Sequence, residues 1–181
     1  MSTSRLTTTS YVVLGMIAMR GRSTSYDLKR AVGHSVGYFW PFPHAQLYSE
    51  PKRLAALGLL DLEIEDEGRR RQLYDINQRG REELKVWLAR RGEDPLQVRD
   101  IAELKLFFGE FADPDDLTSL AAEQIAQHRS RILEYEQIQH RFADRPDVAS
   151  RLVPLGLGLR IERAALSFWE ELLDGHRCAR P

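Results

Sequence analysis

The segment from Gln46 to Gly80 most constrains the fold, because a short amphipathic helix, two short strands and an arginine-rich turn follow one another there with few residues between them. The apolar side of the helix is marked by residues at helical spacing, namely Leu47, Pro51, Leu54 and Leu57. Gly58 then predicts the end of the helix, since a left-handed residue commonly follows the last turn. Pro51 removes one backbone donor, so we expect a kink between Leu47 and Pro51.

The pattern of a β-hairpin follows this helix. From Leu60 to Ile64, apolar residues alternate with acidic ones, which is typical of a strand with one buried face. Residues 66–68, Asp-Glu-Gly, signal a tight turn, and residues 72–76 are predicted to form the return strand. The hairpin tip is therefore expected to carry Arg69, Arg70 and Arg71, beside a helix whose outer side is polar and partly basic.

A helix beside an arginine-tipped hairpin is typical of the DNA-contacting end of a winged helix. In this interpretation the helix enters the major groove, where glutamine pairs with adenine and arginine with guanine, and the hairpin arginines neutralise phosphates or enter the minor groove. The predicted DNA contacts are His44, Gln46, Tyr48, Ser49, Lys52, Arg53, Arg69, Arg70 and Arg71. The alternative is a solvated helix and a charged hairpin in an unrelated α+β domain.

Two further helices are predicted upstream of this segment. Residues 11–19 are strongly apolar and follow four capping candidates at residues 7–10. Ser23 or Ser25 is expected to cap the second helix, and the aromatic and proline cluster at residues 38–43 is expected to pack into the core. Asn77 is expected to cap a helix after the hairpin. Three helices followed by a hairpin indicate a winged helix-turn-helix.

The rest of the chain predicts helices only, beyond a boundary at Asp94-Pro95 that separates residues 1–94 from residues 95–181. Apolar residues recur at threes and fours over two long segments, although Pro154, Gly156 and Gly158 predict an irregular start to the second one. One small winged helix cannot bury two such stripes, so we expect a second copy of the chain to cover them. The predicted dimerisation residues are Leu117, Ala121, Ile125, His128, Ile132, Tyr135, Leu159, Leu166, Trp169 and Leu173.

The predicted fold class is therefore mainly α with a small β-hairpin wing. It consists of an N-terminal winged helix-turn-helix DNA-binding domain and a C-terminal antiparallel helical domain for dimerisation and effector binding. His128 is interpreted as a hydrogen-bonded interface histidine, the alternatives being a ligand or a pH sensor. Glu162 interrupts the apolar stripe and is expected to pair with Arg160 or Arg163 across the dimer.

Aromatic residues in the second half are candidates for an effector pocket, although residues at helical spacing are more often core. These candidates are Phe107, Phe108, Phe111, Phe168 and Trp169. No Gly-rich phosphate loop or nucleophile elbow is evident, so neither enzymatic activity nor a cofactor is predicted. His176 and the single Cys178 lack further ligands at zinc spacing, so no metal site is predicted.

Composition and charge agree with a globular DNA-binding protein. A hydrophobic content of 43% in 181 residues is ample for one or two packed domains. No run approaches the roughly 20 apolar residues of a membrane span, and residues 1–5 are polar rather than a signal sequence, so we expect a cytoplasmic location without membrane contact. The net charge of -1 is unevenly distributed: residues 1–94 carry 15 Lys and Arg against 12 Asp and Glu, whereas the remainder carries 11 against 15.

In the first half, the order of several short motifs resembles that of PadR-type transcriptional regulators. The motifs are residues 11–17, 26–29, 39–40, 47–48, 52–54, 58–60, 68–76, 80–84 and 87–88. The resemblance implies a homodimer, usually a repressor, whose winged helices bind a palindromic operator in double-stranded DNA and whose C-terminal helices dimerise. It also implies an effector in many members, often a phenolic acid or a lipophilic small molecule. Ser25 departs from the glycine that often precedes the tyrosine of the second helix.

The leading hypothesis is therefore a homodimeric, DNA-binding repressor that a small aromatic or lipophilic effector releases from its operator. A transcriptional activator is one alternative. A winged helix that binds only other proteins is another, which Glu50, Asp66 and Glu67 near the contact surface favour. A helical small-molecule enzyme is the third, which a pocket with paired titratable groups would favour.

Overall fold

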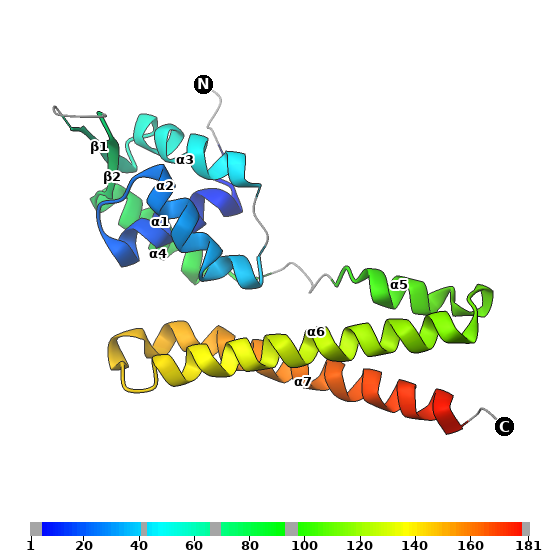
Figure 1. Ribbon diagram of the computed structural model, residues 1–181. Helices are drawn as coiled ribbons and strands as arrows, with labels where there is room; N and C mark the ends of the chain where they lie inside the picture. Colours follow the sequence, from blue (N-terminus) through cyan, green and yellow to red (C-terminus); the bar gives the residue numbers. More distant parts are fainter. Residues whose placement is uncertain (1–4, 41–42, 66–69, 93–97, 179–181) are drawn as a thin grey trace. The chain divides into compact units, whose positions relative to one another are not determined.

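The computed structural model describes residues 5–40, 43–65, 70–92 and 98–178. The chain divides into two compact units, Met1–Asp94 and Pro95–Pro181. The first unit contains α1 (Thr8–Arg20), α2 (Ser25–Gly33), the 3-10 helix η1 (Val36–Tyr38), α3 (His44–Ala56), β1 (Leu60–Ile64), β2 (Gln72–Ile76) and α4 (Gln78–Ala89) (Figure 1). The second contains α5 (Ile101–Phe107), η2 (Gly109–Phe111), α6 (Pro114–Arg141), η3 (Pro146–Val148) and α7 (Ala149–Cys178). The predicted fold class, mainly α with a two-stranded hairpin, is confirmed. Each helix that the structure describes is too short or too polar to cross a lipid bilayer.

Capping boxes start the first two helices. The Thr7 hydroxyl accepts a hydrogen bond from the Ser10 N–H and the Ser10 hydroxyl accepts one from the Thr7 N–H, and Thr24 and Asp27 form the same reciprocal pair at α2. The prediction that Ser23 or Ser25 caps α2 is therefore wrong by one residue. Ser23 instead exchanges two backbone hydrogen bonds with Tyr74 of β2, at 3.0 and 2.9 Å, which ties the start of α2 to the wing.

Gly58 ends α3 and turns the chain into β1. Its φ of 71° lets the Leu59 N–H reach the Leu54 carbonyl at 3.0 Å, while the Gly58 N–H reaches the Ala55 carbonyl at 2.9 Å. The helix runs without interruption through Pro51, whose ring is buried on the core side. β1 and β2 pair antiparallel from Leu60 with Ile76 to Ile64 with Gln72.

The predicted buried face of β1 is only partly present, because Leu60 is buried whereas Leu62 and Ile64 are exposed. The expected turn at residues 66–68 and Arg69 lie outside the described residues.

α1 packs against α2, α3, α4 and β2 and so forms the centre of the core of this unit. Tyr11 stacks on Trp87 of α4 with ring centroids 4.8 Å apart. The aromatic cluster expected in the core does not lie there, since Tyr38, Phe39 and Trp40 are exposed.

In the second unit, α6 and α7 lie antiparallel along each other, and α5 packs against α6 (Figure 1). The predicted dimerisation residues lie on the faces where these helices meet. Ala121, Ile125, Tyr135, Leu159 and Trp169 are buried within one chain, and Leu117, His128, Ile132, Leu166 and Leu173 are half-buried. The stripes of α6 and α7 cover each other in part, so their burial does not by itself require a second copy, and dimerisation through them stays a prediction.

α7 also runs as one helix from Ala149 to Cys178, so the expected irregular start is not observed. Gly158 has a packing role instead. A Cβ atom at this position would lie 3.0 Å from the ring of Tyr135, so the glycine allows α6 and α7 to approach closely.

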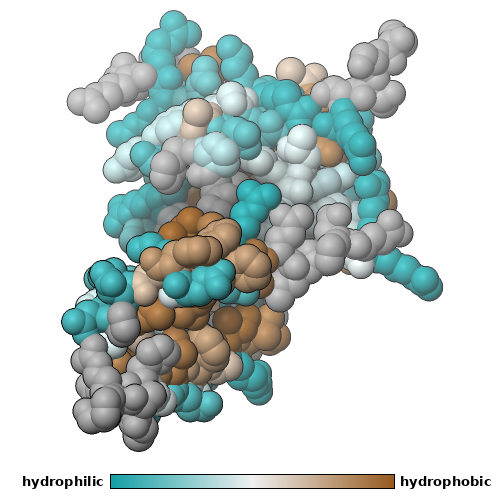
Figure 2. All heavy atoms as spheres, turned by 90° about the vertical axis from the view of Figure 1, so that its right-hand side faces the viewer, coloured by the Kyte–Doolittle hydropathy of each residue, from teal (hydrophilic) through white to brown (hydrophobic). Residues whose placement is uncertain are grey.

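A second apolar stripe lies on the outer side of α7, opposite the face that packs on α6. Its members are Val153, Leu157, Ile161 and Phe168, all more than half exposed. α5, η2 and the residue between them add further exposed apolar side chains, namely Ile101, Leu104, Phe107, Phe108 and Phe111. Figure 2 shows apolar side chains gathered on this unit over the end that carries α5 and η2. A helix that is apolar on two opposite sides is usually buried on both.

Candidate nucleic-acid interface

α3 presents a polar outer face built by its helical period. Leu47, Pro51 and Leu54 point into the core, which leaves the intervening residues outward. The exposed residues among the predicted DNA contacts of α3 are Gln46, Tyr48, Ser49 and Lys52. The side chain of His44 lies outside the described residues. The structure thus brings four of the predicted contacts together on one helix face.

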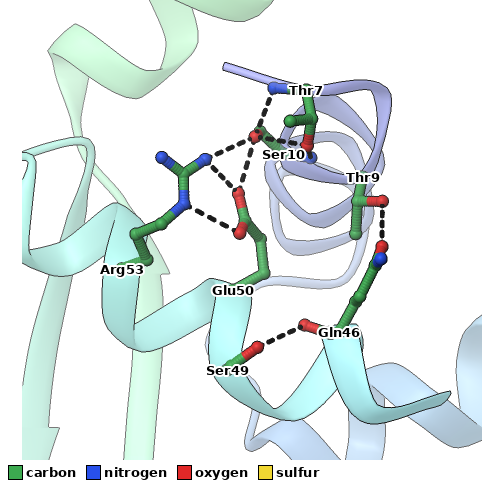
Figure 3. Close-up of polar contacts among 7 residues, drawn as sticks. All are labelled: Thr7, Thr9, Ser10, Gln46, Ser49, Glu50 and Arg53. Carbon is green, nitrogen blue, oxygen red and sulfur yellow. Dashed lines mark hydrogen bonds and ion pairs between the residues drawn. The ribbon is translucent and has the colours of Figure 1, made fainter. Parts of the chain in front are cut away.

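Arg53 is placed differently from the other predicted contacts. Its Nε and Nη2 donate to the two carboxylate oxygens of Glu50, at 2.9 and 2.6 Å, and Nη2 also donates to the Ser10 hydroxyl at 2.9 Å (Figure 3). Ser10 is fully buried at the start of α1, and its hydroxyl donates to Glu50 at 2.6 Å. The guanidinium therefore links α3 to α1, so Arg53 has a structural role in the single chain; that it contacts DNA stays a prediction.

Glu50 faces α1 rather than the outer surface of α3. Burial would raise the pKa of its carboxyl, but hydrogen bonds from Arg53 and Ser10 and the positive charge of Arg53 outweigh this effect and lower the pKa. Because this carboxylate is buried and paired, it does not add negative charge to the face on which Gln46 and Lys52 lie. Glu50 therefore does not support the hypothesis of a winged helix that binds only other proteins, for which Asp66 and Glu67 were the other two residues.

Substitution of Glu50 by glutamine is expected to lower the free energy of unfolding by about 1.5–3 kcal/mol near neutral pH, since hydrogen bonds to a charged group are lost. The folded-state pKa of Glu50 lies below its ordinary value of 4.5, so its contribution is present above that pH and disappears as the pH falls through the folded-state pKa. Urea unfolding of both proteins as a function of pH tests this, with the exposed Glu63→Gln as control. If Glu50→Gln lost the same amount of unfolding free energy at pH 7 and at pH 3, the lowered pKa of Glu50 would be contradicted.

The wing places two of its three predicted arginines in solvent. Arg70 is exposed and has a φ of 46°, so the chain turns in the left-handed region at this residue. Arg71 is exposed as well, and its Nε lies 3.8 Å from the Glu65 carboxylate across the hairpin. Arg69 lies outside the described residues. Arg70 and Arg71 therefore place two exposed guanidinium groups at the end of the wing, and groups of this kind contact phosphates.

Two residues beside α3 were not predicted from the sequence. The Thr9 hydroxyl of α1 donates to Gln46 Oε1 at 2.9 Å, and the Lys29 ammonium of α2 lies 5.8 Å from the centre of the Tyr48 ring. Both contacts join residues far apart in the sequence, so no local motif signals them. They position side chains at the two edges of the outer face of α3.

The predicted effector residues do not enclose a common pocket. Phe107 and Phe111 are 80% and 81% exposed, Phe108 and Phe168 are exposed, and only Trp169 is buried. A groove of about 490 Å³ lies instead along α5 and α6. Its walls carry three basic residues, Arg99, Lys105 and Arg131, and two acidic ones, Asp100 and Glu123, beside the apolar Ile101, Ala102 and Leu120.

A buried carboxylate joins α6 and α7 next to this groove. Glu162 accepts from Arg131 at 3.2 Å, and its other oxygen lies 2.6 Å from His128 Nδ1. The expected pairing of Glu162 with Arg160 or Arg163 is therefore wrong, because both observed partners belong to α6 of the same chain. His128 is hydrogen-bonded as predicted, but its partner Glu162 belongs to the same chain and not to the partner of the expected dimer.

Comparison with known proteins identifies the two halves of the chain. Residues 13–86 match the model of the transcriptional regulator PadR-like family, and residues 98–176 match that of the virulence activator alpha C-terminal family. The negative transcriptional regulator PadR of Bacillus subtilis (strain 168) is 25% identical over 173 residues, which cover 90% of this chain and 94% of that protein.

Two solved structures share the fold. Bacillus subtilis PadR in complex with operator DNA has a TM-score of 0.83 and 24% identity, over 94% of this chain and 99% of that one. The same protein in complex with p-coumaric acid has a TM-score of 0.76 and 22% identity, over 93% and 94% of the two chains. These two structures show that the fold is shared, and the match over residues 13–86 identifies the first unit of this chain as a member of the PadR-like family of transcriptional regulators.

Proposed function

We propose that the protein is a homodimeric repressor that binds a palindromic operator and is released from it by a small aromatic or lipophilic effector. The observation that supports this most is the outer face of α3, where Gln46, Ser49 and Lys52 are exposed together while Glu50 and Arg53 pair with each other against α1. Side chains of this kind bind base edges in the major groove, and arginines of a wing contact the phosphates of the DNA backbone.

Repression and dimerisation rest on separate observations. The similar PadR of Bacillus subtilis is named a negative regulator, and its structure was solved with operator DNA. For this chain, the outer stripe of α7 and the apolar side chains of α5 and η2 supply a surface for a second copy. An isologous dimer would present two recognition helices about 34 Å apart, as an inverted repeat on one face of DNA requires.

The effector site that we propose is the groove along α5 and α6. Its basic side chains and apolar wall suit a small aromatic acid, because the carboxylate would meet Arg99 or Lys105 while the ring lies on Ile101 and Leu120. The structure of Bacillus subtilis PadR with p-coumaric acid supports this chemical class. The exposed aromatic residues predicted earlier, Phe107 and Phe111, are assigned to the dimer surface instead.

Alanine at Arg70 is expected to weaken binding to all DNA sequences by a similar factor and to lower the slope of log affinity against log salt concentration by about one, as loss of one phosphate contact should. The measurement is the dissociation constant for an operator duplex and an unrelated duplex at several salt concentrations. Arg81→Ala, which removes an exposed arginine of α4, is the charge-matched control. Equal salt slopes for Arg70→Ala and the wild type would contradict the wing's role.

A further inference from the structure

Gln46 is held by a contact that decides which of its atoms faces DNA. The Thr9 hydroxyl donates to Gln46 Oε1 at 2.9 Å, and the close-up in Figure 3 shows this contact beside the Ser10, Glu50 and Arg53 network. Thr9 precedes the buried Ser10, and Glu50 follows Gln46 by one helical turn. Two neighbouring residues of α1 thus bond two residues on one side of α3. The Thr9–Gln46 contact is exposed, but it lies next to a buried network that holds the same two helices together.

The amide of a glutamine offers an acceptor oxygen and a donor nitrogen that point in different directions. A free amide pairs with adenine by accepting from N6 and donating to N7. In this chain Oε1 accepts from the Thr9 hydroxyl, which occupies one of its two lone pairs and leaves both Nε2 hydrogens for another acceptor. Gln46 is thereby presented as a donor.

We infer that Thr9 is a positioning residue that sets the base preference of Gln46. With Nε2 as the contacting group, Gln46 selects a base with acceptors on its major-groove edge. Guanine fits best because its N7 and O6 are both acceptors, and cytosine fits worst because it presents an amino donor. This replaces the adenine contact expected from the sequence. The inference rests on the proposed function, since it requires α3 to enter the major groove.

Selection from a random duplex pool by the full-length protein and its variants tests the inference. The position that Gln46 reads is identified as the one whose preference disappears in Gln46→Ala. At that position the wild type is expected to prefer guanine. Thr9→Val keeps the shape of the side chain but removes the hydroxyl, so the preference for guanine over adenine should fall about threefold to tenfold, the equivalent of one hydrogen bond.

Thr9→Ser restores the hydroxyl and is expected to restore the guanine preference. This rescue separates positioning from a general structural effect, and thermal unfolding of Thr9→Val should match the wild type because Thr9 is only half-buried. An unchanged base profile in Thr9→Val would overturn the inference, and so would a wild-type preference for cytosine or adenine at this position. If the wild type enriched no inverted repeat at all, the proposed function would fail together with the inference. An inverted repeat with an unaltered profile in Thr9→Val would refute the inference alone.

Discussion

Replacing Leu157 and Ile161 together by glutamate is expected to convert the protein into a monomer and to weaken operator binding by about a hundredfold to ten-thousandfold, because the two half-sites are then bound independently. Both side chains are more than half exposed in the single chain, at 59% and 53%, so the substitutions leave the packing of α6 on α7 intact. In a dimer the same positions would bury two carboxylates per chain in an apolar contact, which is strongly unfavourable.

Mass in solution and affinity for an operator duplex are the measurements. The control is Gln137→Glu, which adds a negative charge to an exposed position of α6 that lies away from α7. It is expected to remain dimeric and to bind the operator normally. If the double variant remained dimeric and bound the operator with wild-type affinity, the outer stripe of α7 would not be the dimer surface. This result would not contradict the assignment of the winged helix.

The second large effect is expected at Gly80 in the first turn of α4. A Cβ atom there would lie 2.2 Å from the Leu59 carbonyl oxygen and 2.9 Å from Ile76 Cγ1. Since the first of these is backbone, no side-chain rotation relieves the clash, and Gly80→Ala should lower the free energy of unfolding by about 3 kcal/mol. The melting temperature should then fall by roughly 6–12 °C.

Gly15→Ala is the matched control for this substitution. Gly15 also lies in a helix of the first unit, but no heavy atom stands within 4 Å of the added Cβ. Alanine is the better helix former, so this variant should be neutral or more stable by up to about 1 kcal/mol. Equal melting temperatures for the two variants would show that α4 does not approach β1 as closely as the structure indicates.

The elements of the winged helix were predictable because their signals are local. The spacing of Leu47, Leu54 and Leu57 and the position of Gly58 define α3, and the alternation from Leu60 to Ile64 defines β1. The outward residues of α3 follow from the same period. Arg53 could not be assigned in this way, because its partners depend on how α1 packs on α3. Ser10 is 43 residues away from Arg53 in the sequence.

The second unit shows a different limit of sequence patterns. Helical spacing indicates that Ile125, Leu159 and Trp169 are buried, but it does not say which surface covers them. They were assigned to a partner chain, whereas α6 and α7 cover each other. The outer stripe with Leu157 and Ile161 was not predicted, because α7 is apolar on two sides. The stripe that faces α6 has more members, and only that stripe was recognised from the sequence.

The most direct test of the central claim is selection of bound sequences from a random duplex pool by the purified chain, with the mass of the protein in solution recorded on the same sample. A homodimeric regulator that uses α3 of each chain as its recognition helix should enrich an inverted repeat and have the mass of two chains. Enrichment of no sequence at low salt, or of a single unrepeated site by a monomer, would contradict the proposed function.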